Sequence, residues 1–157
     1  MGRGIAACLL ANGLEVIADE RTAKRRKESV GHIEQALEEL GRRKLVPRAR
    51  MRAWRKRFRL AASIPEMAPA KFVIECVKED LEIKREIFRK LEGAVARDAV
   101  IASNTSSLPI SVLQSGRKAP ERFIGMHWGE PAQIMRYLEV IPGDATSQGA
   151  LDLTDLR

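Results

Sequence analysis

Apolar residues near the start of the chain recur at helical spacing and then at strand spacing. Ile5, Cys8 and Leu9 stand at i, i+3 and i+4, which predicts a helix over residues 2–11. Asn12-Gly13 provides a helix stop, because both residues tolerate the conformation that ends a helix. The next stretch, LEVIAD, predicts a short strand that ends in an acidic residue.

A polar and strongly basic region follows this strand. Its periodicity predicts a long helix over residues 22–43, with Ile33, Leu37 and Leu40 as the apolar stripe. Pro47 breaks the pattern. Residues 48–60 predict a second basic helix, whose apolar positions are Met51, Trp54 and Phe58.

The second half of the chain alternates apolar runs with amphipathic segments. Strands are expected at 71–77, 99–104, 122–128 and 137–143, a helix at 79–95, and a turn with a short helix at 107–116. Alternating strands and helices predict an α/β fold with a parallel sheet and helices on its faces. Ligands of such sheets bind beyond the carboxyl ends of the strands.

Composition narrows the class of protein. The length of 157 residues suits one domain with a core, and no apolar run reaches the roughly 20 residues that cross a bilayer. No signal peptide is recognisable, so the expected location is cytoplasmic and no membrane partner is expected. Cys8 and Cys76 fit no metal spacing, and we expect them to be buried apolar residues and no metal to be bound.

The net charge of +7 is concentrated in one segment. Residues 21–60 hold 15 of the 28 Lys and Arg and 4 acids, so this segment alone is +11 and the remainder −4. Such a cluster of basic residues could bind nucleic acid, a membrane surface or a phosphorylated ligand. Most of its members are equally consistent with an ordinary solvated surface. Binding to nucleic acid is disfavoured, because no motif for it is present.

Polar residues follow the predicted strands where ligands would bind. The segment Ser103–Ser107 follows a buried strand and suits either a capped turn or a ligand site rich in hydroxyls. His127 ends another strand, and a strand–loop–strand path would bring it to Glu139, which would make the imidazole a better proton acceptor; a structural histidine is the alternative. Gly2 stands at the start of a predicted helix, and an acidic residue follows it 17 or 18 positions later. This pattern is consistent with the second half of a dinucleotide-binding turn, or with an ordinary helix–strand unit.

Taken together, several segments resemble one family in order and spacing. They are MGRGIA, VIECVKEDLEIKREIF, IASNTSSL, ERFIGMH with its following Pro131, and MRYLEVIPGDATS. The chain resembles the NAD-binding domain of the 3-hydroxyacyl-CoA dehydrogenases from residue 1 to about residue 147. The resemblance implies a Rossmann-type doubly wound parallel sheet that binds NAD, and reversible oxidation of a (3S)-3-hydroxyacyl-CoA to the 3-ketoacyl-CoA.

The resemblance also implies roles for individual residues. His127 matches the catalytic histidine, Glu139 the glutamate that orients it, and Ser106 a serine that hydrogen-bonds substrate and cofactor. The remaining positions on the cofactor side are Gly2, Glu79, Lys84 and Glu130. The acid that would bind the ribose is either Asp19 or Glu20. Arg43, in a basic helical hairpin over about residues 21–60, matches a lysine that contacts CoA.

The chain departs from the family pattern in three respects, and these change what we expect of its fold and activity. The first, central strand and the first two glycines of G-x-G-x-x-G have no match, which would leave a slot in the sheet and two open strand edges. Glu130 stands where the family has an asparagine that reaches the nicotinamide, and an ionised carboxylate cannot donate a hydrogen bond. The helical C-terminal domain, which makes family members dimeric, also has no match.

We therefore expect residues 1–157 to form an incomplete Rossmann domain with little turnover on its own. The alternative function is a non-catalytic module that binds CoA or another polyanion through its basic segment.

Overall fold

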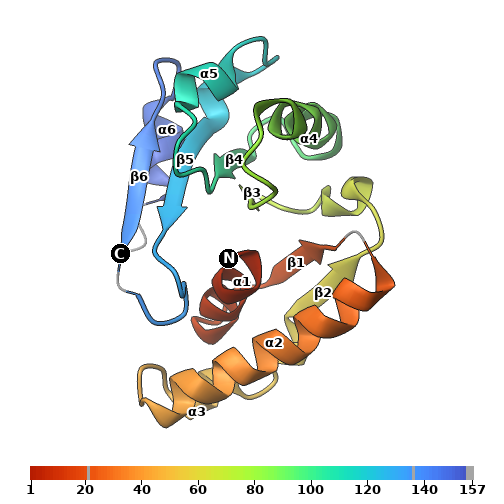
Figure 1. Cartoon of the computed structure of the whole chain (residues 1–157), viewed down its shortest axis with the longest axis vertical. Helices are drawn as coiled ribbons and strands as arrows, with labels where there is room; N and C mark the ends of the chain where they lie inside the picture. Colours follow the sequence, from red (N-terminus) through yellow and green to blue (C-terminus); the bar gives the residue numbers. More distant parts are fainter. Residues whose placement is uncertain (21, 136, 155–157) are drawn as a thin grey trace. The chain divides into compact units, whose positions relative to one another are not determined.

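The computed structural model describes residues 1–20, 22–135 and 137–154. The chain packs as two compact units, Met1–Ser63 with Gly129–Arg136 and Ile64–Trp128 with Tyr137–Arg157 (Figure 1). The described strands form two separate sheets, one with the order β1-β2 and one with the order β3-β4-β5-β6. Among the described strands, β1 and β3 each pair on one side only.

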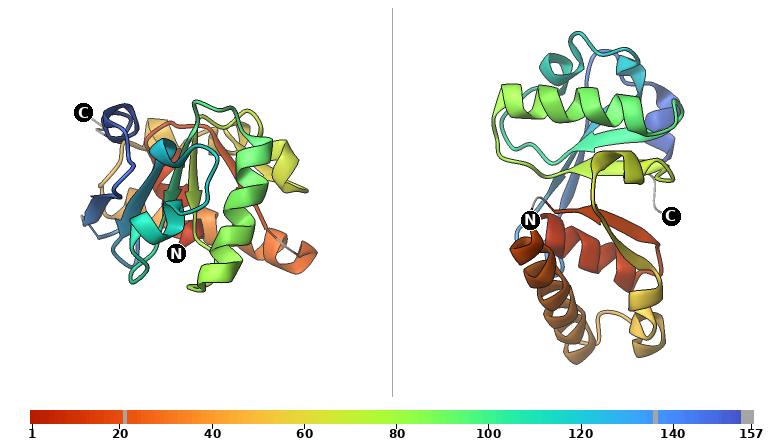
Figure 2. Two further views of the ribbon diagram at one scale, coloured as in Figure 1. Left: turned by 90° about the horizontal axis from the view of Figure 1, so that it is seen from above. Right: turned by 90° about the vertical axis from the view of Figure 1, so that its right-hand side faces the viewer.

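The described part of the first unit contains three α-helices, a 3-10 helix and a two-stranded parallel sheet. Its elements are α1 (Gly2–Ala11), β1 (Val16–Asp19), α2 (Ala23–Arg42), α3 (Arg48–Met51), the 3-10 helix η1 (Trp54–Lys56) and β2 (Phe58–Ala61). Helix α1 packs against α2 (Figure 2), and Leu10, Ile33 and Leu37 are buried between them. Thr22 caps α2, because its hydroxyl accepts from Arg25 N at 3.2 Å.

The prediction of one basic helix over residues 48–60 is wrong. Ala53 has a φ of 60°, which no right-handed helix accommodates, so the helical pieces α3 and η1 are short and separate. Beyond them, Phe58–Ala61 forms β2, which pairs in parallel with β1 from Val16↔Phe58 to Asp19↔Ala61. Hydrogen bonding with β1 decides this strand, and the local sequence does not reveal that partner.

The second unit contains a four-stranded sheet with helices on both faces. Its elements are the 3-10 helix η2 (Ile64–Met67), β3 (Phe72–Glu75), α4 (Leu81–Ala94), β4 (Val100–Ser103), α5 (Ile110–Gln114), the 3-10 helix η3 (Pro120–Arg122), β5 (Phe123–Trp128), β6 (Leu138–Pro142) and α6 (Gln148–Asp152). Side chains of α4 and α5 pack on one face with Ile101 and Phe123, whereas α6 packs on the other with Val100 and Ile124.

Strand direction in this sheet changes at its last strand. β3, β4 and β5 are parallel, as expected, whereas β6 runs antiparallel to β5. The physical reason is the short connection between Trp128 and Leu138, which holds no crossover helix of the kind that a parallel pair needs.

Helix α4 forms as its amphipathic pattern predicts. Asp80 caps it by accepting from Glu82 N at 3.0 Å and Ile83 N at 3.1 Å. On the buried face, Phe88 meets Phe123 edge-on, with 5.2 Å between ring centroids. This packing fixes the start of α4 beside the carboxyl ends of β3 and β4.

In the part of the chain that the structure describes, no helix is both long and apolar enough to span a membrane. Cys8 and Cys76 are free thiols and half-buried, and burial raises their pKa values to about 11 and about 12.

Candidate functional site

Polar side chains of the second unit gather at one edge of its sheet. Parallel pairing places the carboxyl ends of β3, β4 and β5 together, with Glu75 beside Ser103 and Ser103 beside Gly125. The link continues past the strands, since Trp128 N donates to Asn104 Oδ1 at 2.9 Å. This is the edge at which α/β proteins bind ligands.

His127 and Glu139 meet at this edge across the antiparallel pair β5–β6. The two residues stand opposite each other in the register, and 2.8 Å separates His127 Nδ1 from Glu139 Oε2. Both side chains are partly exposed. With Nδ1 directed at the carboxylate, Nε2 is the ring nitrogen that remains for a ligand, and no described residue hydrogen-bonds it.

Tyr137 adds a second contact to the same carboxylate. His127 and, next in size, the Tyr137 hydroxyl hydrogen-bond Glu139, and both contacts lower the pKa of Glu139. The same bond raises the pKa of Tyr137. The tyrosine ring also stands edge-on to the imidazole, at 88° and 6.5 Å between centroids. Tyr137 was not predicted as a site residue, although its place two residues before Glu139, on the same face of the chain, was a usable signal.

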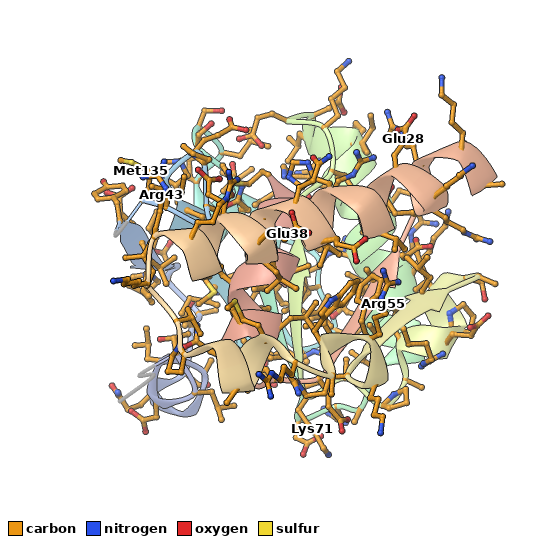
Figure 3. All side chains as sticks on the ribbon, turned by 90° about the horizontal axis from the view of Figure 1, so that it is seen from below. Glu28, Glu38, Arg43, Arg55, Lys71 and Met135 are labelled. Atoms are coloured by element: carbon orange, nitrogen blue, oxygen red, sulfur yellow. The ribbon has the colours of Figure 1, made fainter. Side chains whose placement is uncertain are left out.

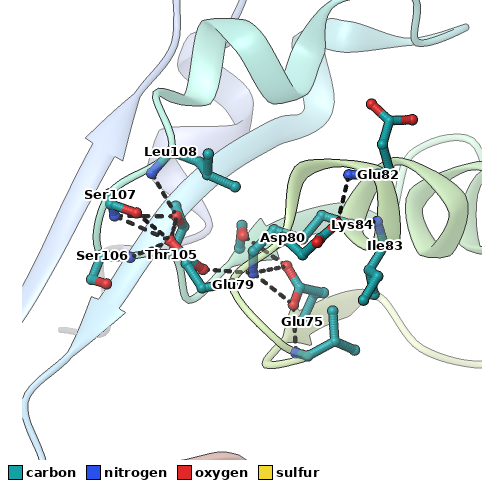
Figure 4. Close-up of polar contacts among 12 residues, drawn as sticks. Glu75, Glu79, Asp80, Glu82, Ile83, Lys84, Thr105, Ser106, Ser107 and Leu108 are labelled. Atoms are coloured by element: carbon teal, nitrogen blue, oxygen red, sulfur yellow. Dashed lines mark hydrogen bonds and ion pairs between the residues drawn. The ribbon is translucent and has the colours of Figure 1, made fainter.

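The loop after β4 is held by Glu79 (Figure 4). Glu79 Oε1 accepts from the backbone N–H groups of Ser106 and Ser107, both at 3.1 Å. The Thr105 hydroxyl donates to the same oxygen. Burial raises the pKa of Glu79, but the bonds from Thr105 and Lys84 outweigh it and lower that pKa to about 2. Ser106 itself is exposed, so its hydroxyl is available to a ligand.

Lys84 lies beneath this loop and makes its contacts with protein carboxylates. Its side chain is 0% exposed, Nζ donates to Glu75 Oε2 at 2.9 Å, and the ammonium forms an ion pair with Glu79 Oε2 at 3.2 Å. Glu75 is itself buried and accepts from Ser103 Oγ at 2.7 Å. Ser103 was expected in a capped turn or a hydroxyl-rich ligand site, whereas its buried partner Glu75 was not predicted, because a polar residue that ends an apolar strand gives no signal of a buried partner.

In the first unit, Glu20 lies close to the start of α1. Its Oε1 accepts from Arg3 Nε at 3.3 Å and from Ser29 Oγ at 2.5 Å. Gly2 is the first residue of α1, whose first turn carries no acidic side chain. Asp19, the other candidate acid, is exposed at the end of β1. The carboxylate of Glu20 and the open first turn of α1 are therefore brought to one place.

Arg43 lies at the end of α2, on the basic face of the first unit. Its Nη2 donates to Glu39 Oε1 at 2.9 Å, and its side chain is exposed. Figure 3 shows Glu28, Glu38 and Arg43 projecting from α2, so this surface carries charges of both signs. A pocket of about 420 Å³ lies next to Arg43 and is lined by Gly41, Arg42, Lys44, Val46 and Pro47.

The predicted residues fall into two groups. The second unit brings together His127 with Glu139, and Ser106 with Glu79 and Lys84. The first unit holds Gly2, Asp19, Glu20, Arg43 and Glu130. Glu130 is exposed, with Oε1 at 4.0 Å from the backbone nitrogen of Met1.

Comparison with known proteins gives consistent matches over nearly the whole chain. The family described as "3-hydroxyacyl-CoA dehydrogenase, NAD binding domain" matches residues 1–155. A 5-formyl-3-hydroxy-2-methylpyridine 4-carboxylate 5-dehydrogenase of Mesorhizobium japonicum is 34% identical over 94% of this chain and 47% of its own. A fatty acid oxidation complex subunit alpha of Psychrobacter cryohalolentis is 32% identical over 98% of this chain and 21% of its own.

Solved structures agree with these matches. The crystal structure of a 3-hydroxybutyryl-CoA dehydrogenase from Escherichia coli K12 superposes with a TM-score of 0.90, at 29% identity, over 98% of this chain and 32% of that one. The chain therefore spans half or less of the length of these relatives.

Proposed function

The chain belongs to the 3-hydroxyacyl-CoA dehydrogenase family as an NAD-binding domain, and from this membership we propose that it serves the NAD-dependent oxidation of a (3S)-3-hydroxyacyl-CoA to the 3-ketoacyl-CoA. The activity proposed is that of the whole protein, because the relatives are longer than this chain. The observation that carries the proposal is the contact of 2.8 Å between His127 Nδ1 and Glu139 Oε2 at the ligand-binding edge of the sheet.

His127 acts as the base in this proposal. Nε2 takes the proton of the substrate hydroxyl while the hydrogen on the same carbon leaves as hydride, so that the C–O bond becomes a carbonyl. Glu139, in contact with Nδ1, orients the ring and stabilises the imidazolium that forms. In the reverse direction the imidazolium returns the proton. Ser106, exposed in its loop, hydrogen-bonds the substrate or the cofactor.

NAD, when bound, supplies the hydride acceptor. Two features of the first unit fit it. Glu20 has one oxygen held by Ser29 and Arg3, whereas no described residue hydrogen-bonds Oε2, which can accept from a ribose diol. The open first turn of α1 offers N–H groups and a positive dipole end to the pyrophosphate. The remaining proposed cofactor-side residues are Gly2, Asp19, Glu79, Ser106 and Glu130. Lys84, which the sequence also suggested, is buried against Glu75 and Glu79, so any effect that it has on the cofactor passes through Glu79.

Arg43 is the proposed CoA contact. Its guanidinium is exposed at the end of α2, beside the pocket whose lining includes two further bases, and guanidinium groups bind phosphate strongly. The same observation favours the second candidate function, a module that binds CoA or another polyanion without turnover.

Two measurements on the purified chain test the proposal. NADH binding is measured by titration, and NADH-dependent reduction of acetoacetyl-CoA is measured at high protein concentration, each with the wild type and with His127→Gln. We expect NADH to bind both proteins and any turnover to require His127. Absence of NADH binding would refute the cofactor, and turnover that survives in His127→Gln would refute the base. CoA binding without NADH binding would support the second candidate.

A further inference from the structure

A buried lysine joins two carboxylates beneath the loop that carries Ser106 (Figure 4). Lys84 Nζ donates to both oxygens of Glu75, at 3.0 and 2.9 Å, and forms an ion pair with Glu79 Oε2 at 3.2 Å. All three contacts of the ammonium are therefore with protein carboxylates. With 0% of the lysine side chain exposed, no donor of Lys84 is left for a ligand.

Glu75 anchors this chain of contacts in the sheet. It is the last residue of β3, its side chain is 1% exposed, and Ser103 Oγ of β4 donates to its Oε2 at 2.7 Å. Val77 N donates to the other oxygen at 2.5 Å. Two neighbouring strands and α4 therefore converge on one carboxylate, which gives it a single orientation.

Glu79 stands at the opposite end of the chain of contacts and reaches the loop. Only its Oε2 faces Lys84, whereas Oε1 accepts from the backbone on both sides of the Ser106 side chain, through Ser106 N and Ser107 N. The position of Glu79 therefore sets the backbone conformation at Ser106. In turn, the ammonium of Lys84 sets the direction of Glu79.

Burial of this charge cluster contributes little net free energy to the stability of the fold. Each buried ion has a large desolvation cost, and apolar side chains of the same volume often give equal or greater stability. What the ions provide, and apolar side chains would not, is a directed contact to Glu79. We propose that Glu75 is a positioning residue: through Lys84 it fixes Glu79, and Glu79 fixes the loop that presents Ser106. The importance of that loop rests on the proposed function, but its fixation does not.

The test follows the loop itself by the rate at which backbone amides exchange with water, measured by NMR on the whole chain. Lys84→Met removes the ammonium, and we expect the amides of Ser106 and Ser107 to exchange about tenfold faster. Amides in the middle of α4, at Phe88 and Leu91, should keep their wild-type rates. Because Lys84→Met leaves two carboxylates facing each other, the double variant Glu75→Gln/Lys84→Met keeps the proposal testable if the single variant does not fold.

Glu92→Gln is the matched control. Glu92 is also a buried carboxylate of α4, and it accepts from Lys118 N at 2.9 Å at the far end of the helix. We expect this variant to leave the Ser106 and Ser107 amides unchanged. Wild-type exchange of these amides in the folded double variant would overturn the proposal, as would equal acceleration in Glu92→Gln. Failure of the wild type to bind NADH would refute the proposed function and leave the exchange result standing.

Discussion

Replacing Glu79 with Gln removes the charge that both Lys84 and the Ser106 loop contact, while it keeps the shape of the side chain. In the wild type, burial raises the pKa of Glu79, but the bonds from Thr105 and Lys84 lower it from 4.5 to about 2. At 1.36 kcal/mol for each pKa unit, this lowering corresponds to roughly 3 kcal/mol of stability. Because 33% of the side chain is exposed, solvent screening reduces the expected contribution to about 1–2 kcal/mol.

The sign of the pH dependence follows from the depressed pKa. The unfolded chain takes up a proton at Glu79 near pH 4.5, whereas the folded chain does so near pH 2. The stabilisation is therefore complete above about pH 5 and is lost as the pH falls through this window. We expect Glu79→Gln to be about 1–2 kcal/mol less stable than the wild type at pH 7, with the difference shrinking toward zero near pH 2.

Urea unfolding at a series of pH values measures this difference. Trp128 fluorescence in a Trp54→Phe background reports the second unit, which contains Glu79. Glu82→Gln is the control, since Glu82 lies in the first turn of α4, three residues after Glu79, but is 78% exposed. We expect this control to change stability by less than about 0.5 kcal/mol. A Glu79→Gln difference that stays constant from pH 6 to pH 2.5 would refute the reasoning, as would a variant as stable as the wild type.

Three further predictions concern the other contacts. His127→Gln should lower any NADH-dependent reduction of acetoacetyl-CoA by about 10²–10⁴-fold without weakening NADH binding in a titration, and weaker binding alone would argue for a structural role. Tyr137→Phe removes a hydrogen bond to Glu139, so the pKa of Glu139 should rise toward its ordinary value in a carboxyl NMR titration; an unchanged pKa would argue against the contact. Arg43→Glu should weaken CoA binding by about tenfold in calorimetry, whereas Lys71→Glu, an equal charge change in the other unit, should not; equal loss in both would indicate nonspecific attraction.

The sequence placed most elements because their signals are local. The long helix that begins near Thr22, the amphipathic helix after Asp80 and the apolar strands of the second unit depend on residues close to each other in the sequence. The pairing of His127 with Glu139 was also within reach, since a strand, a loop and a returning strand give it directly. Family motifs supplied Ser106 and Glu79, whose roles stay predictions.

Features that depend on distant partners were missed. β2 was predicted as part of a helix, because the backbone bonds that make Phe58–Ala61 a strand come from β1, about 40 residues earlier. For β2, the free energy of an interaction across the fold outweighs the local preference.

The buried cluster beneath the Ser106 loop shows most clearly which features the sequence determined and which the tertiary structure decided. From the sequence, Lys84 and Glu79 are two charged residues near the start of an amphipathic helix, where side chains are ordinarily solvated. Hydrophobic periodicity determined that helix and the strands beside it. Only the packing of α4 against β3 and β4 decided that Lys84 is buried against Glu75, because a buried ion is tolerated only where the tertiary structure supplies its counter-charge.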